Sequence, residues 1–441
     1  MNKRVVVALA LTATLSGCGI FKGGGERGPK TAVLGERIPI LSTSTDTVAD
    51  PGLADVPVVV PPAVANDSWT QPGGSAAKNL GNVALGASPR QVWSAAIPGG
   101  DITKRIGSTP AVAGGRLYVI SADAVVHAFD AKTGGRLWQA ALGGGKKDRS
   151  VLFGGGVSVD GERVFATTGR GDAAALDVKT GKVLWKVRPA GPLRGAPAIG
   201  GGNIYVLTQD NQILALKPDN GETVWTVSAT LQGAGVFGVA APAFAQGTVV
   251  AGFSSGELSA LRYENGRIVW QDQLSRTSIT TSVSTISDID AAPVIAEGKV
   301  YAIGQGGRMV GMDLVNGQRL WELSIGGISM PWLAGEWLFV VTDDAKLMCI
   351  ARTTGKIRWV TQLAGFRDPK KRNKPVAWYG PVLAGGRLML VNSIGQMQPV
   401  APDTGKAAEP TKAGKQFYLP PVVADNMLYL IDGKGRITGW R

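Results

Sequence analysis

Side chains that could carry catalysis are scarce in this 441-residue sequence, which contains one histidine and two cysteines. His127 lies in the apolar stretch 125–129, which is typical of a β-strand, so we interpret it as structural. A single histidine leaves almost nothing from which to build a His-based zinc site or a Ser-His-Asp triad. The glycine-rich stretches 143–145 and 154–156 lack the Lys-Ser/Thr ending of a phosphate loop. We therefore expect no catalytic residue, no metal site and no cofactor.

Cys18 is the nucleophile whose surroundings indicate a definite chemistry, the acylation of its thiol. Lys3 and Arg4 precede an apolar run at 5–15, which has the length of a signal peptide and is too short to span a bilayer as an anchor. The run ends in Leu-Ser-Gly-Cys, which resembles the lipobox of bacterial lipoproteins. This resemblance implies that residues 1–17 are a signal peptide and that Cys18 is the lipidated first residue of the mature chain. The alternative is that Cys18 is incidental to an ordinary cleavage site.

The residues around the two cysteines also indicate a location. Two or more acyl chains would attach the protein stably to a membrane, whereas one chain would be marginal. Gly19 follows the cysteine where an Asp would imply retention in the inner membrane, so we expect the periplasmic face of the outer membrane. Cys349 would then be the one cysteine besides Cys18, and its apolar neighbours predict a buried, inert thiol.

A repeated cassette dominates the rest of the chain. Asp130 to Trp138 (DAKTGGRLW) recurs closely as Asp177 to Trp185 (DVKTGKVLW), with further copies ending at Trp225, Trp270, Trp321 and Trp359. A seventh copy keeps the turn but has Glu409 where the tryptophan would stand. The spacing of about 40 to 50 residues is that of a propeller blade with four short strands. The Thr-Gly or Asn-Gly pair suits a tight turn with positive φ, and the indole after it can cover the turn of a neighbouring blade.

The count of strands predicts how the ring closes. Residues 419–441 supply three strands after the seventh cassette, and Gln91 to Ser94 resembles the final strand of a cassette without a blade before it. Pairing the two ends removes the exposed sheet edges, so we predict an all-β, eight-bladed β-propeller over 86–441. Residues 18–85 are rich in Gly, Pro, Ser and Thr and are expected to form a flexible tether. The apolar islands 37–41 and 56–60 could dock on the propeller or on a partner.

Strand order also assigns the loops to two faces. The connections between blades share one face with the second-to-third turns, and the Thr-Gly turns lie on the other. The longest connections should therefore form the partner-binding face, because long loops on a rigid ring often carry function. The chain has 46 basic and 33 acidic residues, a net charge of +13, but the charges are scattered and export makes nucleic acid an unsuitable partner. The dense basic run 367–374 is interpreted as a solvated loop.

The cassettes resemble the repeats of pyrroloquinoline-quinone dehydrogenases, in which an Ala-x-Asp-x-x-Thr-Gly-x-x-x-Trp pattern docks neighbouring blades. Such enzymes also resemble one another in a vicinal disulfide and a set of carboxylates for calcium. A vicinal disulfide is impossible here, because Cys349 is the one cysteine besides the lipidated Cys18. The chain is also shorter than those enzymes. A quinoprotein-like periplasmic dehydrogenase remains the runner-up, and a structural propeller of the cell envelope is a third possibility.

The lipobox, the tether and eight such blades together resemble the BamB family of outer-membrane assembly lipoproteins. Ser287-Asp288-Ile289-Asp290 is similar to the family's Ser-Asp-Val-Asp segment, which implies that Asp288 and Asp290 meet a POTRA domain of a BamA-like protein. Because the pair is two residues apart in an extended segment, we expect one exposed acidic face. The family's companion Leu-x-Leu-Arg-Gly loop is placed at Val236-Phe237-Gly238, where Phe237 would replace the arginine. The resemblance implies a non-catalytic scaffold that binds BamA and other Bam subunits and helps deliver unfolded outer-membrane proteins.

Overall fold

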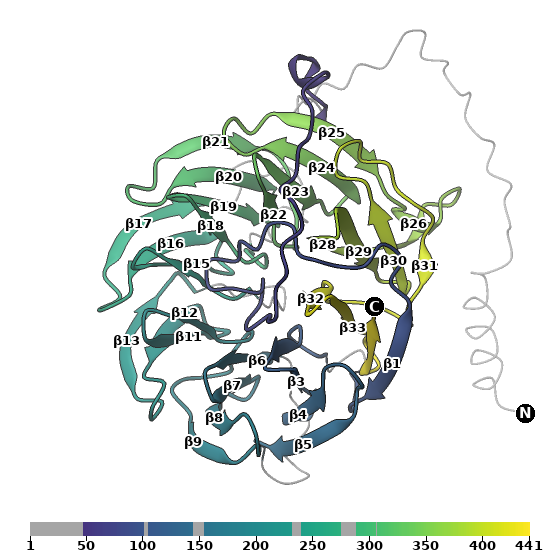
Figure 1. The fold of residues 1–441 in the computed structure, drawn as a ribbon. Helices are drawn as coiled ribbons and strands as arrows, with labels where there is room; N and C mark the ends of the chain where they lie inside the picture. The colour runs from purple at the N-terminus through teal and green to yellow at the C-terminus, as the bar shows by residue number, and fades with distance from the viewer. Residues whose placement is uncertain (1–46, 101–104, 144–153, 232–239, 275–287, 306) are drawn as a thin grey trace, which may run out of the picture. The chain divides into compact units, whose positions relative to one another are not determined.

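The strands form a closed ring of eight four-stranded antiparallel sheets, the blades of a β-propeller (Figure 1). The computed structural model describes residues 47–100, 105–143, 154–231, 240–274, 288–305 and 307–441. Each blade has its first strand at the centre of the ring and its fourth at the circumference (Figure 1). The predicted fold class is confirmed. Among the described residues the helical element is the 3-10 turn η2 (Pro51–Leu53), and no helix there is long and apolar enough to cross a membrane.

Blades 1 to 4 follow one another without crossovers, as the repeat predicts. They are blade 1, β2 (Ala111–Ala113), β3 (Arg116–Ile120), β4 (Val125–Asp130) and β5 (Arg136–Ala141); blade 2, β6 (Gly155–Asp160), β7 (Arg163–Thr168), β8 (Ala173–Asp177) and β9 (Val183–Val187); blade 3, β10 (Ala198–Gly200), β11 (Asn203–Leu207), β12 (Gln212–Leu216) and β13 (Thr223–Ser228); and blade 4, β14 (Ala243–Ala245), β15 (Thr248–Gly252), β16 (Glu257–Arg262) and β17 (Ile268–Gln273).

Blades 5 to 8 complete the ring. They are blade 5, β18 (Val294–Ala296), β19 (Lys299–Gly304), β20 (Arg308–Asp313) and β21 (Arg319–Leu323); blade 6, β22 (Trp332–Ala334), β23 (Trp337–Val341), β24 (Lys346–Ala351) and β25 (Ile357–Gln362); blade 7, β28 (Trp378–Ala384), β29 (Arg387–Asn392), β30 (Gln396–Val400) and β31 (Thr411–Lys412); and blade 8, β32 (Val422–Ala424), β33 (Met427–Ile431), β34 (Arg436–Trp440) and β1 (Gln91–Ala96). The basic run after blade 6 forms a separate exposed hairpin, β26 (Phe366–Asp368) and β27 (Asn373–Pro375).

Blade 8 is built from both ends of the propeller. Strand β1 pairs antiparallel with β34, in a register that runs from Gln91 opposite Trp440 to Ala96 opposite Arg436. The prediction that an N-terminal strand completes the last blade is therefore confirmed. The ladder joins residues that are more than 300 positions apart and leaves β34 without an open edge.

The cassette tryptophans dock each blade onto the next. Gly181, at φ 71°, lies under the ring of Trp138, and a methyl group added to it would lie 2.5 Å from that ring. The Trp138 indole Nε1 donates a hydrogen bond to the Val178 carbonyl of the same turn, at 3.0 Å. The same tryptophan-to-carbonyl bond joins six other pairs of blades, through Trp93, Trp185, Trp225, Trp270, Trp321 and Trp359. The sequence prediction that these tryptophans are packing residues is confirmed for the described chain.

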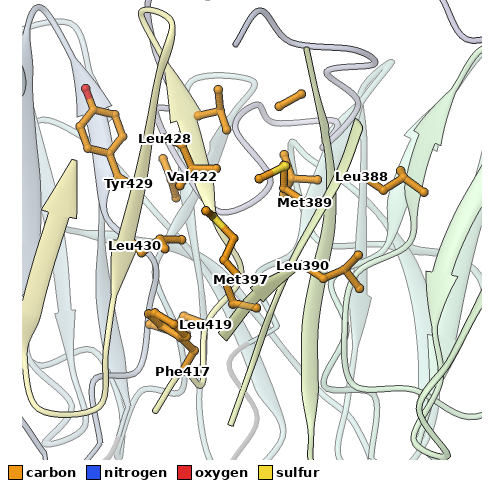
Figure 2. Packing of buried hydrophobic residues seen from close by; sticks show 14 of the residues in the cluster. Leu388, Met389, Leu390, Met397, Phe417, Leu419, Val422, Leu428, Tyr429 and Leu430 are labelled. Atoms are coloured by element: carbon orange, nitrogen blue, oxygen red, sulfur yellow. The ribbon is translucent and has the colours of Figure 1, made fainter. Parts of the chain in front are cut away.

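The seam between blades 7 and 8 is the exception, and the sequence explains it. Glu409 replaces the tryptophan in blade 7, and blade 8 has no third-to-fourth turn for an indole to cover, because its fourth strand comes from the N-terminal side. Phe417 and Leu419 fill this seam instead, packing with Leu390 and Met397 (Figure 2). These four side chains are 0% to 7% exposed, so the seam is as dry as the others.

We expect Gly181→Ala to destabilise the propeller more than Gly161→Ala. Both glycines have positive φ, 71° and 55°, but nothing lies within 4 Å of a methyl group at Gly161. Gly161→Ala therefore measures backbone strain alone, about 1 kcal/mol. Gly181→Ala adds the clash with Trp138 and should cost about 2 kcal/mol more. Urea unfolding of the two variants measures the difference, and equal midpoints would contradict the proposed role of the Trp-Gly contact.

The segment before the first blade circles the inside of the ring rather than hanging free. Residues 66–83, here called the central belt, make a hydrogen bond to the innermost strand of every blade, in order around the ring (Figure 1). The bonded pairs are Asn66 with Val423, Trp69 with Val112, Thr70 with Val159, Gln71 with Ile199, Ala76 with Phe244, Ala77 with Ile295, Gly81 with Trp332, and Val83 with Leu383. The belt thus supplies partners to strand edges that face the channel.

The path into the belt also contradicts the expected tether over part of its length. Asp50 forms an ion pair with Lys356 at 3.0 Å, and the Val56 carbonyl accepts a hydrogen bond from Arg358, so the chain runs across blade 6 (Figure 1). Trp69 is 2% exposed and Val83 is 1% exposed. Residues 47–85 are therefore docked on the propeller, because several of their apolar side chains and many of their backbone groups find partners there. The predicted signal peptide and the remainder of the tether lie outside the described residues.

Two faces of the ring can now be distinguished. The approach of residues 47–61 passes the turns between β22 and β23 and between β24 and β25, which lie on the same side as the Thr-Gly turns. We call this side the turn face. The opposite side, formed by the connections between blades and the second-to-third turns, is called the loop face. The N-terminal segment therefore enters on the turn face and leaves the loop face uncovered by residues 47–61.

Candidate functional site on the loop face

The candidate site begins with Arg194, in the connection between β9 and β10. Its backbone is held by blades on both sides, since the Arg194 amide donates to the Leu207 carbonyl at 2.8 Å and its carbonyl accepts from the Gly155 amide at 2.8 Å. The following Gly195-Ala196-Pro197 leads directly into the innermost strand of blade 3. This anchoring fixes where the guanidinium can reach.

Arg194 meets both predicted aspartates, which lie in the connection between blades 4 and 5. Its Nη2 is 3.0 Å from Asp288 Oδ1 and 3.1 Å from Asp290 Oδ1. The three side chains are 4%, 0% and 6% exposed, so the cluster is nearly closed to water. A shared arginine therefore joins the loops that begin blades 3 and 5.

Burial determines the protonation of this cluster. The pKa of Asp290 is raised well above its usual value, first because burial penalises the carboxylate and second because Asp288 is beside it, while Arg194 opposes the shift. Two carboxylates cannot both ionise at low cost beside one cation in a dry site. A proton on Asp290 therefore removes one negative charge from the buried cluster. We call these three residues the Arg-Asp-Asp cluster.

The expected exposed acidic face is therefore wrong. Asp288 and Asp290 do share one side of the chain, but that side faces Arg194 and the interior. A position in a long connection favours solvent exposure, but here Arg194 provides a buried partner for both carboxylates. Whether the aspartates take part in partner binding stays a prediction.

The missed signal was present in the sequence one blade earlier than expected. Leu193-Arg194-Gly195 precedes Ala196-Pro197, which is the Leu-Arg-Gly and Ala-Pro pattern of the companion loop. The predicted position, Val236-Phe237-Gly238, precedes a second Ala-Pro pair, Ala241-Pro242. The companion arginine is thus retained, and the structure places it on the two aspartates. Phe237, which was expected to replace it, lies outside the described residues, as does Cys18.

The remaining candidate side chains have structural positions. His127 is 2% exposed beside the Ser121 hydroxyl at 3.2 Å, and burial lowers its pKa to about 4, so the ring is neutral. Cys349 is fully buried in β24, and burial raises the pKa of its thiol. Within the described ranges no group of three or more His, Cys, Asp or Glu could hold a metal ion. The carboxylate set that a calcium-dependent quinone enzyme requires is not found in this part of the chain.

Comparison with known proteins gives the family. A family described as "Outer membrane protein assembly factor BamB" matches residues 82–151 and 122–361. The protein of that name from Alkalilimnicola ehrlichii is 31% identical over 366 residues, covering 82% of this chain and 91% of the relative. The chain belongs to the BamB family. The crystal structure of BamB from Moraxella catarrhalis has a TM-score of 0.68 at 21% identity, covering 80% of this chain and 100% of that chain.

The quinoprotein likeness is limited to the fold. A quinohemoprotein alcohol dehydrogenase from Comamonas testosteroni has a TM-score of 0.65 at 15% identity, covering 90% of this chain and 83% of that chain. Identity this low carries the propeller architecture and no function. The BamB family is named for assembly and not for a reaction.

Proposed function

We propose that this protein is a lipid-anchored, non-catalytic subunit of the machinery that assembles β-barrel proteins in the outer membrane. Its role is to bind the POTRA region of a BamA-like protein, together with other Bam subunits, and to help deliver unfolded outer-membrane proteins. The observation that carries the proposal is the Arg-Asp-Asp cluster on the loop face of a BamB-family propeller. The cluster unites the two segments that the sequence resemblance associates with partner binding.

Burial of the cluster gives it a positioning role in this proposal. The ion pairs hold the connection that precedes blade 3 against the one that precedes blade 5. Gly191 and Pro192, next to the arginine, are exposed and can contact a partner directly. A rigid pair of loops loses less conformational entropy on docking than two free loops would. The cluster thus supports affinity by preorganising the surface around it.

Co-purification from detergent-solubilised outer membranes tests this role. We expect the double variant Asp288→Asn, Asp290→Asn to recover much less of the BamA-like partner than wild type, because the neutral amides release Arg194. Asp219→Asn on the turn face is the matched control, since Asp219 also pairs with an arginine but is 82% exposed. This control should keep the wild-type yield.

A second substitution separates docking from folding. Pro192→Glu changes an exposed side chain beside the cluster and leaves its carbonyl available to the Gln209 amide. It should reduce co-purification while unfolding at the wild-type temperature. Wild-type yield from both Pro192→Glu and the double aspartate variant would show that the partner binds elsewhere.

We further propose that Cys18 anchors the chain to the periplasmic face of the outer membrane. Roughly 30 residues separate Cys18 from the first described residue, Thr47, and a chain of that length spans at most about 100 Å. Because the docked segment enters on the turn face, an anchored chain need not cross the loop face to reach the membrane. This arrangement leaves the loop face available to a partner.

The anchor is tested by Cys18→Ser. Only a thiol can be acylated in this way, so we expect the variant to be exported but to leave the outer-membrane fraction, while the propeller still folds. Fractionation of cells after osmotic shock, with circular dichroism of the purified protein, measures both outcomes. Binding to the partner could also hold the protein at the outer membrane. The same fractionation is therefore repeated after adding Pro192→Glu to the wild-type protein and to the Cys18→Ser variant. Outer-membrane recovery of the doubly substituted protein equal to wild type would contradict the lipid anchor.

A further inference from the structure

A cavity at the mouth of the central channel, on the loop face, has no role in the functions described above. Its volume is about 240 Å³. Trp69 of the central belt and Trp332 of blade 6 line it as a stacked pair, with ring centroids 5.9 Å apart and planes inclined by 13°. Tyr379 of blade 7 and Tyr418, in the connection between blades 7 and 8, add two more aromatic rings to its lining. The cavity therefore presents flat apolar surfaces from four separate segments.

Two buried polar atoms in the cavity lining indicate that a ligand could add bonds there. The Trp69 indole Nε1 and the Gln305 side-chain Oε1 have no hydrogen-bond partner among the described residues. One is a donor and the other is an acceptor. Burying such atoms unpaired costs free energy, and buried polar groups of proteins are normally satisfied. Nine other indoles in the described part of the chain donate to backbone carbonyls, so the unpaired Trp69 differs from them.

A basic hollow adjoins the cavity and shares Arg105 and Tyr418 with it. The Arg105 guanidinium lies 4.7 Å from the centre of the Tyr418 ring. The hollow has a volume of about 410 Å³ and is also lined by Arg367, Lys415 and Lys434. All four cationic side chains are exposed, and none forms an ion pair with the described residues.

Among the described residues that line the two hollows, the acidic groups do not cancel this positive charge at the surface. Asp432 is 3% exposed, and its carboxylate accepts hydrogen bonds from the backbone amides of Lys415, Lys434 and Arg436. Asp290 is held by Arg194. The cations at the mouth are therefore free to attract an anion.

We propose that the cavity and the basic hollow together bind a small aromatic carboxylate, with its ring between the cavity's aromatic side chains and its carboxylate at Arg105. The size of the cavity supports this class, because pockets for drug-sized ligands have volumes of roughly 300–1,000 Å³. This cavity, at about 240 Å³, is smaller and has room for one ring on a short stem. Arginine is well suited to the anion, since its fork can form two hydrogen bonds with a carboxylate. Asp290 of the Arg-Asp-Asp cluster also lines the cavity, but the proposed ligand binding does not depend on partner docking.

Titration calorimetry of the purified full-length chain tests the ligand class. The probe is 3-phenylpropionate, compared with 3-phenylpropanamide, which lacks the charge, and propionate, which lacks the ring. We expect the amide to bind at least about tenfold more weakly, the usual scale for loss of a charge-assisted pair. Propionate should give no measurable heat. Equal binding of the acid and the amide, or no binding of the acid at millimolar concentration, would overturn the proposal. Tighter binding of phenyltrimethylammonium than of 3-phenylpropionate would also overturn the proposal, because it would show that the aromatic side chains bind a cation.

Variants locate the site. Arg105→Gln should weaken 3-phenylpropionate about tenfold, by loss of the ion pair. Ile328→Trp, which places an indole in the lining of the cavity, should abolish binding. Lys132→Gln is the control, since Lys132 is an exposed cation on the turn face. Thermal unfolding checks that each variant is folded. If neither Arg105→Gln nor Ile328→Trp changes the dissociation constant in folded protein, the ligand binds elsewhere and the assignment fails.

A last comparison identifies the source of the carboxylate. An aromatic residue at the free C-terminus of a polypeptide presents the same chemistry as a free small molecule. N-acetyl-glycyl-phenylalanine is therefore titrated beside 3-phenylpropionate, with its C-terminal amide as the control. Tighter binding of 3-phenylpropionate than of the dipeptide supports the small-molecule ligand proposed here. Tighter binding of the dipeptide, lost in its amide, overturns that source and assigns polypeptide C-termini.

Discussion

Replacing Trp69 with alanine is expected to lower the free energy of unfolding by about 3–5 kcal/mol, the range for removing a fully buried aromatic side chain. Trp69 is 2% exposed, stacks on Trp332, and exchanges two backbone hydrogen bonds with Val112 at 2.7 and 2.8 Å. The substitution leaves the backbone bonds possible but removes the indole that joins the belt to blade 6. Urea unfolding followed by tryptophan fluorescence and by circular dichroism measures the loss.

The control for this prediction is Val59→Ala in the segment that leads into the belt. Val59 is 70% exposed, so its truncation should change stability by less than about 0.5 kcal/mol. A free tether would make the two substitutions equivalent. If Trp69→Ala unfolds at the same urea concentration as Val59→Ala, the belt does not stabilise the ring.

Replacing Arg194 with alanine is expected to cost about 3–5 kcal/mol, because removing one partner of a buried ion pair leaves the others uncompensated. Asp288 and Asp290 would then share a dry site with no cation in hydrogen-bond contact. The comparison is Arg163→Ala, whose partner Asp219 is 82% exposed. An exposed pair of this kind is worth at most about 1 kcal/mol. Similar losses from the two substitutions would show that the Arg-Asp-Asp cluster is not a buried, mutually dependent unit.

The pH dependence of stability tests the protonation of the same cluster. The pKa of Asp290 is raised in the folded state, so the folded protein binds this proton more readily than the unfolded chain. The contribution of Asp290 is then most favourable below its unfolded pKa of about 3.9 and is lost as the pH rises through its folded value. Asp290→Asn removes this dependence while keeping the shape of the side chain.

The measurement is the difference in unfolding free energy between Asp290→Asn and wild type at a series of pH values. This difference should move in favour of Asp290→Asn as the pH is raised from acid. A difference that is constant with pH, or that moves toward wild type, would contradict a raised pKa for Asp290.

The repeat was the part of the sequence from which the fold could be predicted. Trp138, Gly134 and their copies act locally, since a turn with positive φ and an indole four residues later have the same consequence in every blade. The closing strand at Gln91 was found by the same pattern. Even the seam that lacks a tryptophan follows from Glu409 and from the missing turn in blade 8.

The central belt and the buried cluster could not be predicted in this way, because both depend on partners that are distant in sequence. A segment rich in Gly, Pro and Ser has the composition of a tether, and only the free strand edges inside the ring give Ala76 and Ala77 their hydrogen bonds. Likewise, an aspartate pair in a long connection suggests solvent exposure until Arg194 is placed beside it. Composition and loop length indicate which conformation a segment adopts in isolation. They contain no information on contacts with residues that are distant in sequence.

The central belt also changes how the propeller should fold. In a ring of repeats each unit contacts its neighbours, so partial structures can form and grow blade by blade. Here one segment bonds to every blade, and its Asn66 reaches Val423, 357 positions along the chain. Contacts of such long range favour slow folding, because the chain must close large loops before they form. The belt therefore makes the eight blades one cooperative unit that is complete only after the C-terminal strands have joined the ring.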